Sequence, residues 1–248
     1  MTVDERIHYI TKGHYTYWNL IGTLREVEDH RGEVCYLSGG VSFIYGISSA
    51  PGQVSGIIGK IRKKELPGEI ALLPESAHLL EAFLADGGFT AGTDWGMAKE
   101  LQYQPLPPPP KHTEVIRVTG PDRLPACGAI LNAAFSYDIF SLGDYQDLFY
   151  TSNVRFYLAA FKGLPVAACM TILGEDHADI AWVGTLPGYR GKGIAGALML
   201  TAEQDALAEG IGIAVLTAFP AGFHAYQRIG YEKCCDITVL SYSGSPIQ

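Results

Sequence analysis

Long apolar runs and clustered positive charge are both missing from this chain of 248 residues. No stretch approaches the roughly 20 apolar residues of a membrane-spanning helix, so we expect no membrane contact. The net charge is −8, and no basic patch of the kind that binds nucleic acid is present. The start, MTVDERIHYI, lacks a basic segment followed by an apolar one, which argues against export and predicts a cytoplasmic protein.

Cysteine is scarce and carries no recognisable spacing. The five cysteines are an odd set without a CxxC pair, which indicates neither a disulfide framework nor a zinc site. We therefore expect small buried thiols and no metal. Apolar residues make up 48% of the chain and charged residues 18%, a globular composition. The sequence does not distinguish a monomer from a homodimer.

A proline-rich segment divides the chain. Residues 104–112, QPLPPPPKH, hold four consecutive prolines, which cannot donate backbone hydrogen bonds and favour an extended, stiff connector. The length also favours two domains. We therefore predict a domain over 1–103, a linker over 104–112 and a second domain over 113–248.

The second domain alternates between strand and helix patterns. The expected order is β-α-α-β-β-β-α-β-α-β, an α/β arrangement with a mixed sheet. A Lys162-Gly163 turn predicts an antiparallel hairpin, and the next strand is apolar on both faces, as a central strand would be. Helix 189–209 is expected to turn Glu203, Asp205 and Glu209 outward. The predicted strands are 113–118, 154–161, 164–173, 176–185, 212–219 and 231–242, and the helices are 121–135, 144–152, 189–209 and 221–229.

The first domain gives a weaker pattern of strand, helix, strand, helix, strand. Its expected elements are strands around a Gly39-Gly40 turn in 32–47, a helix over 51–66, a strand over 69–74, a helix over 76–89 and a strand over 95–103.

The stretch TLPGYRGKGIAGALM, residues 185–199, combines glycines and two cationic side chains at the start of a predicted helix. Amide N–H groups over 191–196 lack acceptors within the helix, so they form a socket for an anion. Gly191, Gly193 and Gly196 let the anion approach the backbone, and Arg190 and Lys192 add positive charge. A phosphate or pyrophosphate fits this socket.

Two other phosphate-binding motifs fit less well. A Walker loop requires serine or threonine after the lysine, but Gly193 follows Lys192. GKGIAG matches the dinucleotide fingerprint GxGxxG, but the next strand ends in LTAF without the acidic residue that such folds place there.

Arg190 to Ala195 read as R-x-x-G-x-A, and here the sequence resembles the GNAT superfamily of acetyl-CoA-dependent N-acetyltransferases, whose loop is [QR]-x-x-G-x-[GA]. ADIAWVGTLPGYRGKG resembles the family's fourth strand with its splayed end, and AVLTAFPAGFHAYQRIGY resembles its fifth strand and the helix that carries Y-x-x-x-G-[FY]. The resemblance covers about residues 113–242. It implies an N-acetyltransferase with acetyl-CoA as cosubstrate and a primary amine, expected to be a small molecule, as acceptor.

The resemblance also implies roles for single residues. The backbone of Val183, Gly184 and Thr185 would hold the pantetheine arm, and Arg190, Gly191, Lys192, Gly193, Ile194, Ala195 and Gly196 would hold the pyrophosphate. Tyr226 would protonate the departing thiolate. Asp179 lies eleven residues before Arg190, where some members carry a glutamate general base. Glu175, His177 and a water relay remain alternatives for the base.

Some features depart from the family or leave the function open. Phe219 stands where many members place an asparagine or serine that contacts the cofactor. Residues 1–103 resemble the degenerate half of tandem GNAT proteins and lack the loop motif, which predicts a silent half that walls the acceptor pocket. Acceptor specificity is expected from residues 121–152. The alternative function is a non-enzymatic acyl-CoA sensor. Candidates to line the acceptor pocket are Tyr15, Tyr17, Trp18, Trp95, Tyr137, Asp138, Phe140, Asp144 and Tyr145.

Overall fold

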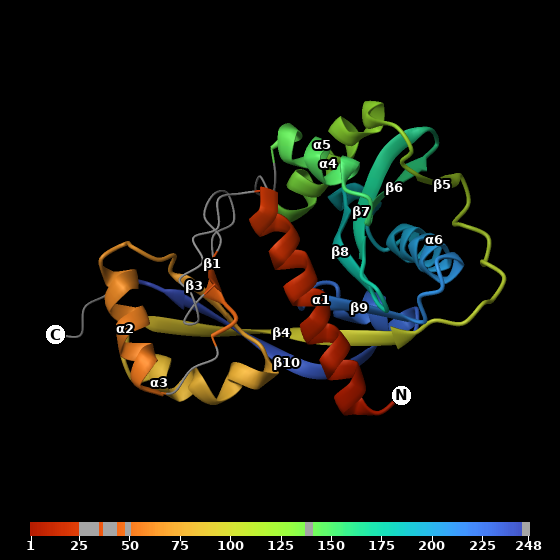
Figure 1. Cartoon of the computed structure of the whole chain (residues 1–248). Coiled ribbons are helices and arrows are strands. Elements are labelled where there is room, and N and C mark those ends of the chain that lie inside the picture. Colours follow the sequence, from red (N-terminus) through yellow and green to blue (C-terminus); the bar gives the residue numbers. More distant parts are fainter. Residues whose placement is uncertain (25–34, 37–43, 48–50, 137–140, 245–248) are drawn as a thin grey trace.

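The computed structural model describes residues 1–24, 35–36, 44–47, 51–136 and 141–244. Within these ranges ten strands form one mixed sheet, in the order β1-β2-β3-β10-β4-β9-β8-β7-β6-β5 (Figure 1). The elements before the proline-rich segment are α1 (Val3–Leu24), β1 (Cys35–Tyr36), β2 (Ile44–Tyr45), α2 (Pro51–Arg62), β3 (Glu69–Leu72), the 3-10 helix η1 (Pro74–Leu79), α3 (Leu80–Leu84) and β4 (Phe89–Glu100).

The elements after that segment follow the predicted order. They are β5 (Thr113–Arg117), η2 (Pro121–Arg123), α4 (Leu124–Phe135), α5 (Leu142–Tyr150), β6 (Val154–Phe161), β7 (Leu164–Leu173), β8 (Ala178–Thr185), η3 (Pro187–Tyr189), α6 (Ile194–Ala208), β9 (Ile213–Ala218), α7 (Phe223–Arg228) and β10 (Glu232–Tyr242). The β6–β7 hairpin is antiparallel, and its two turn residues, Lys162 and Gly163, have positive φ values of 52° and 80°. The central position of β8, between β7 and β9, is confirmed.

The sheet runs without interruption through both parts of the chain. β4 lies between β9 and β10, pairing with each in antiparallel fashion, and β10 also pairs with β3. Residues 101–109 between the two parts contain neither helix nor strand. The N-terminal strands are therefore built into the same sheet as the C-terminal ones, and the domain boundary at 104–112 stays a prediction.

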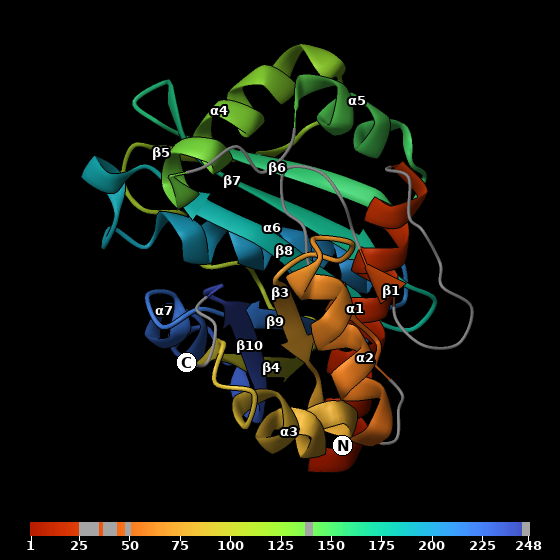
Figure 2. The ribbon, with the colours of Figure 1, turned by 90° about the vertical axis from the view of Figure 1, so that its left-hand side faces the viewer.

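Helices cover the two faces of the central strands in separate layers (Figure 2). One face, called the α1 face, is covered by α1, α4 and α5, and its buried side chains form one cluster. The opposite face, called the α6 face, is covered by α6 and α7 over a second cluster. Within the described residues, no helix combines the length and apolar character needed to cross a membrane.

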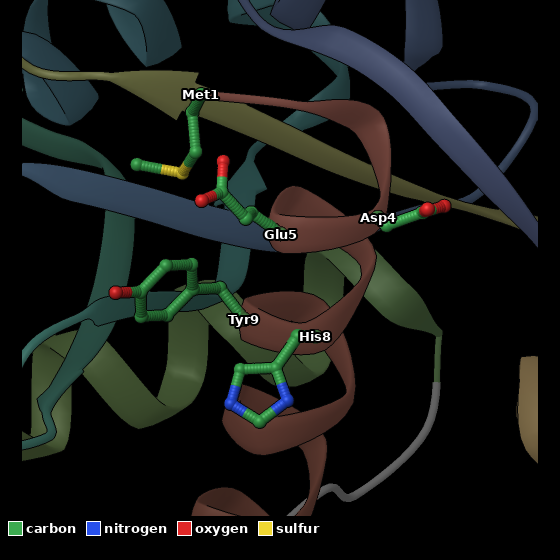
Figure 3. Close-up of a pocket in the computed structure, with 5 residues that line it drawn as sticks. All are labelled: Met1, Asp4, Glu5, His8 and Tyr9. Carbon is green, nitrogen blue, oxygen red and sulfur yellow. The ribbon is translucent and has the colours of Figure 1, made fainter.

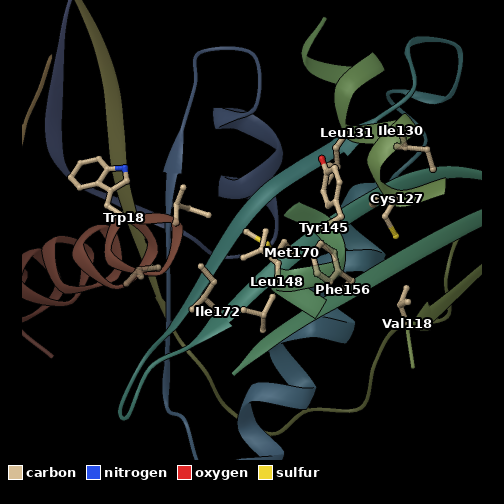
Figure 4. Close-up of a cluster of buried hydrophobic side chains, with 14 of the residues drawn as sticks. Trp18, Val118, Cys127, Ile130, Leu131, Tyr145, Leu148, Phe156, Met170 and Ile172 are labelled. Carbon is tan, nitrogen blue, oxygen red and sulfur yellow. The ribbon is translucent and has the colours of Figure 1, made fainter. Parts of the chain in front are cut away.

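The core of the α1 face lies between α4, α5 and strands β6 and β7 (Figure 4). Cys127 and Leu131 of α4 and Leu148 of α5 point toward Phe156 and Met170 of the sheet, and each is no more than 1% exposed. Burial of such side chains contributes about 1.5–3 kcal/mol each. This packing fixes α4 against β7 and β8, beside the region described below.

Helix α1 has no counterpart in the sequence expectations. Thr2 and Glu5 form a reciprocal capping contact, in which the Glu5 amide donates to Thr2 Oγ1 at 3.2 Å and the Thr2 amide donates to Glu5 Oε2 at 2.7 Å. The buried residues Ile10, Trp18 and Ile21 follow at near-helical spacing. Helix α1 crosses the α1 face over β4, β9 and β8.

Several predicted boundaries are wrong. Helix 76–89 is the 3-10 helix η1 followed by the short α3, and β4 starts at Phe89 rather than at residue 95. Helix α6 begins at Ile194, so the glycine-rich stretch precedes it. The predicted outward position of Glu203 is also wrong: Glu203 is 3% exposed and accepts a hydrogen bond from Lys99 of β4 at 2.5 Å. The Gly39-Gly40 turn lies outside the described residues.

Candidate functional site

The two parallel strands at the centre of the sheet pair over only part of their length. The last register pair between β8 and β9 is Asp179↔Val215, although β8 continues to Thr185 and β9 to Ala218. Beyond Asp179 the strands diverge, so no strand of the described ranges pairs with the β9-facing edge of β8 there. Residues 183–185 lie on this open edge, called the split, where an extended ligand could bind as an added strand.

A β-bulge sits on β8 next to the split. The β7–β8 register shifts between Ala168 and Met170, so Trp182 and Val183 together oppose Cys169. Trp182 has a φ of 52°, which is strained for an aromatic residue. The bulge turns the backbone of β8 at the point where it leaves β9.

The glycine-rich loop meets the predicted geometry of an anion socket. Gly191 and Gly193 have φ values of 75° and 76°, in the left-handed region that glycine tolerates. Among the described residues, the amides of 191–196 donate no hydrogen bond, and the first amide of α6 that does is that of Ala197, to the carbonyl of Gly193. Six consecutive backbone N–H groups at the positive end of a 15-residue helix therefore have no acceptor among the described residues and could bind an anion.

The two cationic side chains of the loop are tied to nearby backbone. The Arg190 guanidinium donates to the carbonyl of Thr185 at 3.0 Å and to that of Ala134 at 2.9 Å. It thereby links the ends of β8 and α4 to the loop. Lys192 donates to the carbonyl of Gly188 at 3.1 Å.

Lys192 also lies over two aromatic rings, 5.3 Å from the centroid of Phe161 and 5.1 Å from that of Tyr189. Cation–π contact of this kind keeps the ammonium near the loop while leaving it solvated. Arg190 and Lys192 are therefore brought together at the socket.

Tyr226 lies on α7 and packs on the α6 face. Burial raises the pKa of Tyr226 to about 12, with a smaller contribution from Cys169 across from the bulge. The phenol is consequently protonated at neutral pH. Its ring meets that of Tyr231 edge-on at 6.3 Å, and within the described residues its hydroxyl has no hydrogen-bond partner.

Asp179 lies at the closed end of the split, on the α1 face. Helix α1 approaches it closely at Gly13, where an added Cβ would come within 3.6 Å of the Asp179 Cβ and 2.8 Å of Val215. Burial raises the pKa of Asp179 to about 7. A carboxyl group with this pKa exists in both protonation states near neutral pH, as a general base requires.

His14 is a candidate that the sequence reasoning missed, because α1 itself was missed. Its Nε2 lies 2.7 Å from Thr217 Oγ1, and burial lowers the pKa of His14 to about 4. The imidazole is therefore neutral at pH 7. Thr217 lies two residues beyond Val215, the register partner of Asp179, so His14 lies beside β9 just past the closed end of the split.

Four aromatic side chains, from α1, β8, α4 and the residue after β9, form a row across the split on the α1 face. Tyr17 accepts a hydrogen bond from Trp182 Nε1 at 2.7 Å. Phe135 of α4 contacts Trp182 edge-on at 5.2 Å and Phe219, just after β9, at 6.2 Å. This ring row, defined as Tyr17, Trp182, Phe135 and Phe219, connects the ends of β8 and β9. Of its members, only Tyr17 was among the candidates to line the acceptor pocket.

Other candidates lie away from the split. Glu175 and His177 are in the β7–β8 turn at the opposite end of β8, where buried His177 contacts Asp176 at 3.0 Å. Glu175 and His177 therefore do not fit a base that reaches residues 183–185.

Several residues expected to line the acceptor pocket also lie away from the split or outside the described residues. Tyr145 is 1% exposed in the core, and Asp144 caps α5 together with Ser141. Trp95 packs on Phe223 at 4.5 Å, on the α6 face. Tyr137, Asp138 and Phe140 lie outside the described residues.

An open hollow of about 390 Å³ lies at the start of α1 (Figure 3). It is lined by Met1, Asp4, Glu5, His8 and Tyr9. The amino group of Met1 pairs with Glu100 at the end of β4, so this hollow lies at the opposite end of α1 from Tyr17 and the split. It is therefore separate from the candidate site.

Comparison with known proteins relates this region of the chain to one family. Residues 125–231, which include β8, the loop, α6 and α7, match the model of the Acetyltransferase (GNAT) family. The matched segment is therefore similar in sequence to GNAT acetyltransferases. No curated protein matches the chain.

Solved structures resemble nearly the whole chain. A GCN5-related N-acetyltransferase from Kribbella flavida has a TM-score of 0.69 at 21% identity and covers 94% of this chain and 96% of its own. One from Sphaerobacter thermophilus has a TM-score of 0.67 at 16% identity, with coverages of 87% and 78%. A GCN5-related N-acetyltransferase-like protein from Streptococcus suis has a TM-score of 0.58 at 15% identity, with coverages of 97% and 100%. These likenesses establish the GNAT fold.

Proposed function

We propose that this protein transfers the acetyl group of acetyl-CoA to a primary amine of a small molecule. The observation that carries the proposal is the run of unpaired amides over 191–196 beside the open edge of β8. Such a run accepts a pyrophosphate, and the open edge accepts an extended amide chain. Both are parts of coenzyme A. We further propose that it acts in the cytoplasm.

The residues that would hold acetyl-CoA fall into two groups. Residues 183–185 would bind the pantetheine arm through their backbone, with one N–H directed at the thioester oxygen. Residues 190–196 would bind the pyrophosphate through backbone amides, and Arg190 and Lys192 would add positive charge. When bound, acetyl-CoA supplies the acetyl group as an activated thioester. The transfer calls for no metal.

Tyr226 would act as the general acid. In the transfer a carbon–nitrogen bond forms, the carbon–sulfur bond breaks, and the sulfur needs a proton. The Tyr226 phenol keeps its proton at neutral pH because its pKa is about 12. A thiolate that is desolvated in the same place also becomes more basic, which favours the proton transfer.

Asp179 would act as the general base for the amine. At about 3.3 Å per residue, Asp179 lies roughly 13 Å along β8 from residue 183, so the proton would travel through water. The neutral imidazole of His14, which lies beside Thr217 just past the closed end of the split, would orient that water. The proton removed from nitrogen ends on the carboxylate.

Residues 1–103 would form a degenerate GNAT-like half that binds no cofactor. The element order β2-α2-β3-η1-α3-β4 in the described part supports this, as does the lack of an R-x-x-G-x-A loop there. Helix α1 and β4 would then wall the acceptor side of the split.

The test combines binding with turnover. Titration calorimetry with acetyl-CoA should give micromolar affinity, weakened at least tenfold, or about 1.4 kcal/mol, in an Arg190→Ala, Lys192→Ala double variant. Thiol release with a panel of primary amines should fall at least a hundredfold in Tyr226→Phe, while acetyl-CoA affinity stays unchanged. Tyr150→Phe, at a residue 72% exposed on α5, is the control.

The outcomes separate the alternatives. No acetyl-CoA binding would overturn the proposal. Binding without thiol release for any amine would favour the acyl-CoA sensor.

A further inference from the structure

One carboxylate on the α1 face has no hydrogen-bond or ion-pair partner in the described part of the chain. Asp94 lies on β4, where alternate residues face α1: an added Cβ at Gly96 would come within 2.9 Å of Ile10. Asp94 is half-buried, and within the described residues it forms no hydrogen bond or ion pair. Burial alone raises its pKa to about 6. A half-buried carboxylate without a cation is costly unless something else binds there.

The strand register places Asp94 beside the ring row. Trp95 of β4 pairs with Ala218 of β9, so Asp94 is level with Phe219, the next residue along the chain. Neighbouring strands are about 4.8 Å apart, which puts Asp94 roughly 5–10 Å from the split. Phe219 is 45% exposed, and the other three rings are half-buried. A ligand that reaches the split along the rings therefore ends near the carboxylate.

The ring row and Asp94 would recognise different parts of one amine ligand. The ring row offers apolar contact and cation–π attraction to the body of an amine. The carboxylate offers an ion pair to a charge that does not react, since the reacting nitrogen must be neutral and lie in the split. On the basis of the proposed function, we propose that the acceptor is a diamine with an apolar spacer: one amine is acetylated at the split, and the other is held as an ammonium by Asp94.

The test measures amine binding without acetyl-CoA. The probes are p-xylylenediamine and 4-methylbenzylamine, which share an aromatic ring and one aminomethyl group and differ in the second ammonium. Calorimetry with the full chain at pH 8 should show at least tenfold tighter binding of the diamine. In Asp94→Asn the two probes should bind alike. Asp4→Asn, the same chemical change at the opposite end of α1, should keep the preference.

Each outcome decides the matter. Equal binding of the two probes to the unmodified protein, or a preference that survives in Asp94→Asn, overturns the inference. Asp94→Asn breaks no hydrogen bond or ion pair among the described residues, and thermal unfolding checks that it folds. Thiol release from acetyl-CoA is measured separately: amine preference without any release would overturn the proposed function alone, and release on monoamines without diamine preference would overturn this inference alone.

Discussion

The glycines at the two ends of α6 allow a matched experiment on the anion socket. Gly191 precedes the helix with a φ of 75°, and Gly210 follows it with a φ of 84°. An added Cβ meets nothing within 4 Å at either position. Alanine at each therefore causes the same backbone strain, about 1–2 kcal/mol, without a clash in the protein.

The two variants should differ only in binding. Each should lower the midpoint of thermal unfolding by about 2–4 °C per kcal/mol, as expected for a chain of this size. In Gly191→Ala the new methyl group occupies the space through which an anion reaches the backbone, so acetyl-CoA affinity should fall at least tenfold, or about 1.4 kcal/mol. Gly210→Ala should bind acetyl-CoA like the unmodified protein.

Differential scanning calorimetry and titration calorimetry measure the two quantities. Equal loss of affinity in both variants would mean that strain, not the socket, controls binding. Normal affinity in Gly191→Ala would remove the loop from the binding site.

Three further predictions concern buried ionisable groups. Folded Asp179 has a pKa of about 7, against about 3.9 for an unfolded aspartate, so the free energy of unfolding should fall as pH rises through this window. Asp179→Asn should therefore melt higher than the unmodified protein at pH 8 but not at pH 4, and lose the rise in kcat/KM centred near pH 7. Because folded His14 has a pKa of about 4, the free energy of unfolding should fall as pH falls from about 6.5 to 4. The difference in this free energy between pH 7 and pH 5, measured by urea unfolding, should be smaller in His14→Gln than in the unmodified protein. Lys99→Met should lower the free energy of unfolding by about 3–5 kcal/mol because it leaves Glu203 buried without its cation. Adding Glu203→Leu should restore most of that free energy. A denaturant titration in which the double variant unfolds no later than the single variant would contradict this prediction.

The sequence predicts the elements after residue 113 well because their patterns are local. The hairpin over 154–173 joins two short apolar runs through a Lys162-Gly163 turn, and both ends match the observed strands. Helix α1 was missed because its β-branched and aromatic residues and Gly13 weaken helix propensity. Its capping pair, Thr2 and Glu5, was the signal that could have revealed it.

The site was predictable only where it is contiguous. The unpaired amides over 191–196 follow from glycine content and a helix start. Asp94 and Phe219 lie 125 positions apart in the sequence, and they meet only through the β4–β9 register. No local pattern contains that register, because it depends on β4 entering the sheet between β9 and β10. The same holds for His14 beside Thr217.

The position of β10 also constrains how the chain is made. This last strand, Glu232–Tyr242, fills the place between β3 and β4, which are synthesised more than 130 residues earlier. Until β10 leaves the ribosome, both earlier strands present open edges that can pair with other chains. We expect a product cut short before residue 232 to keep both edges open and to aggregate.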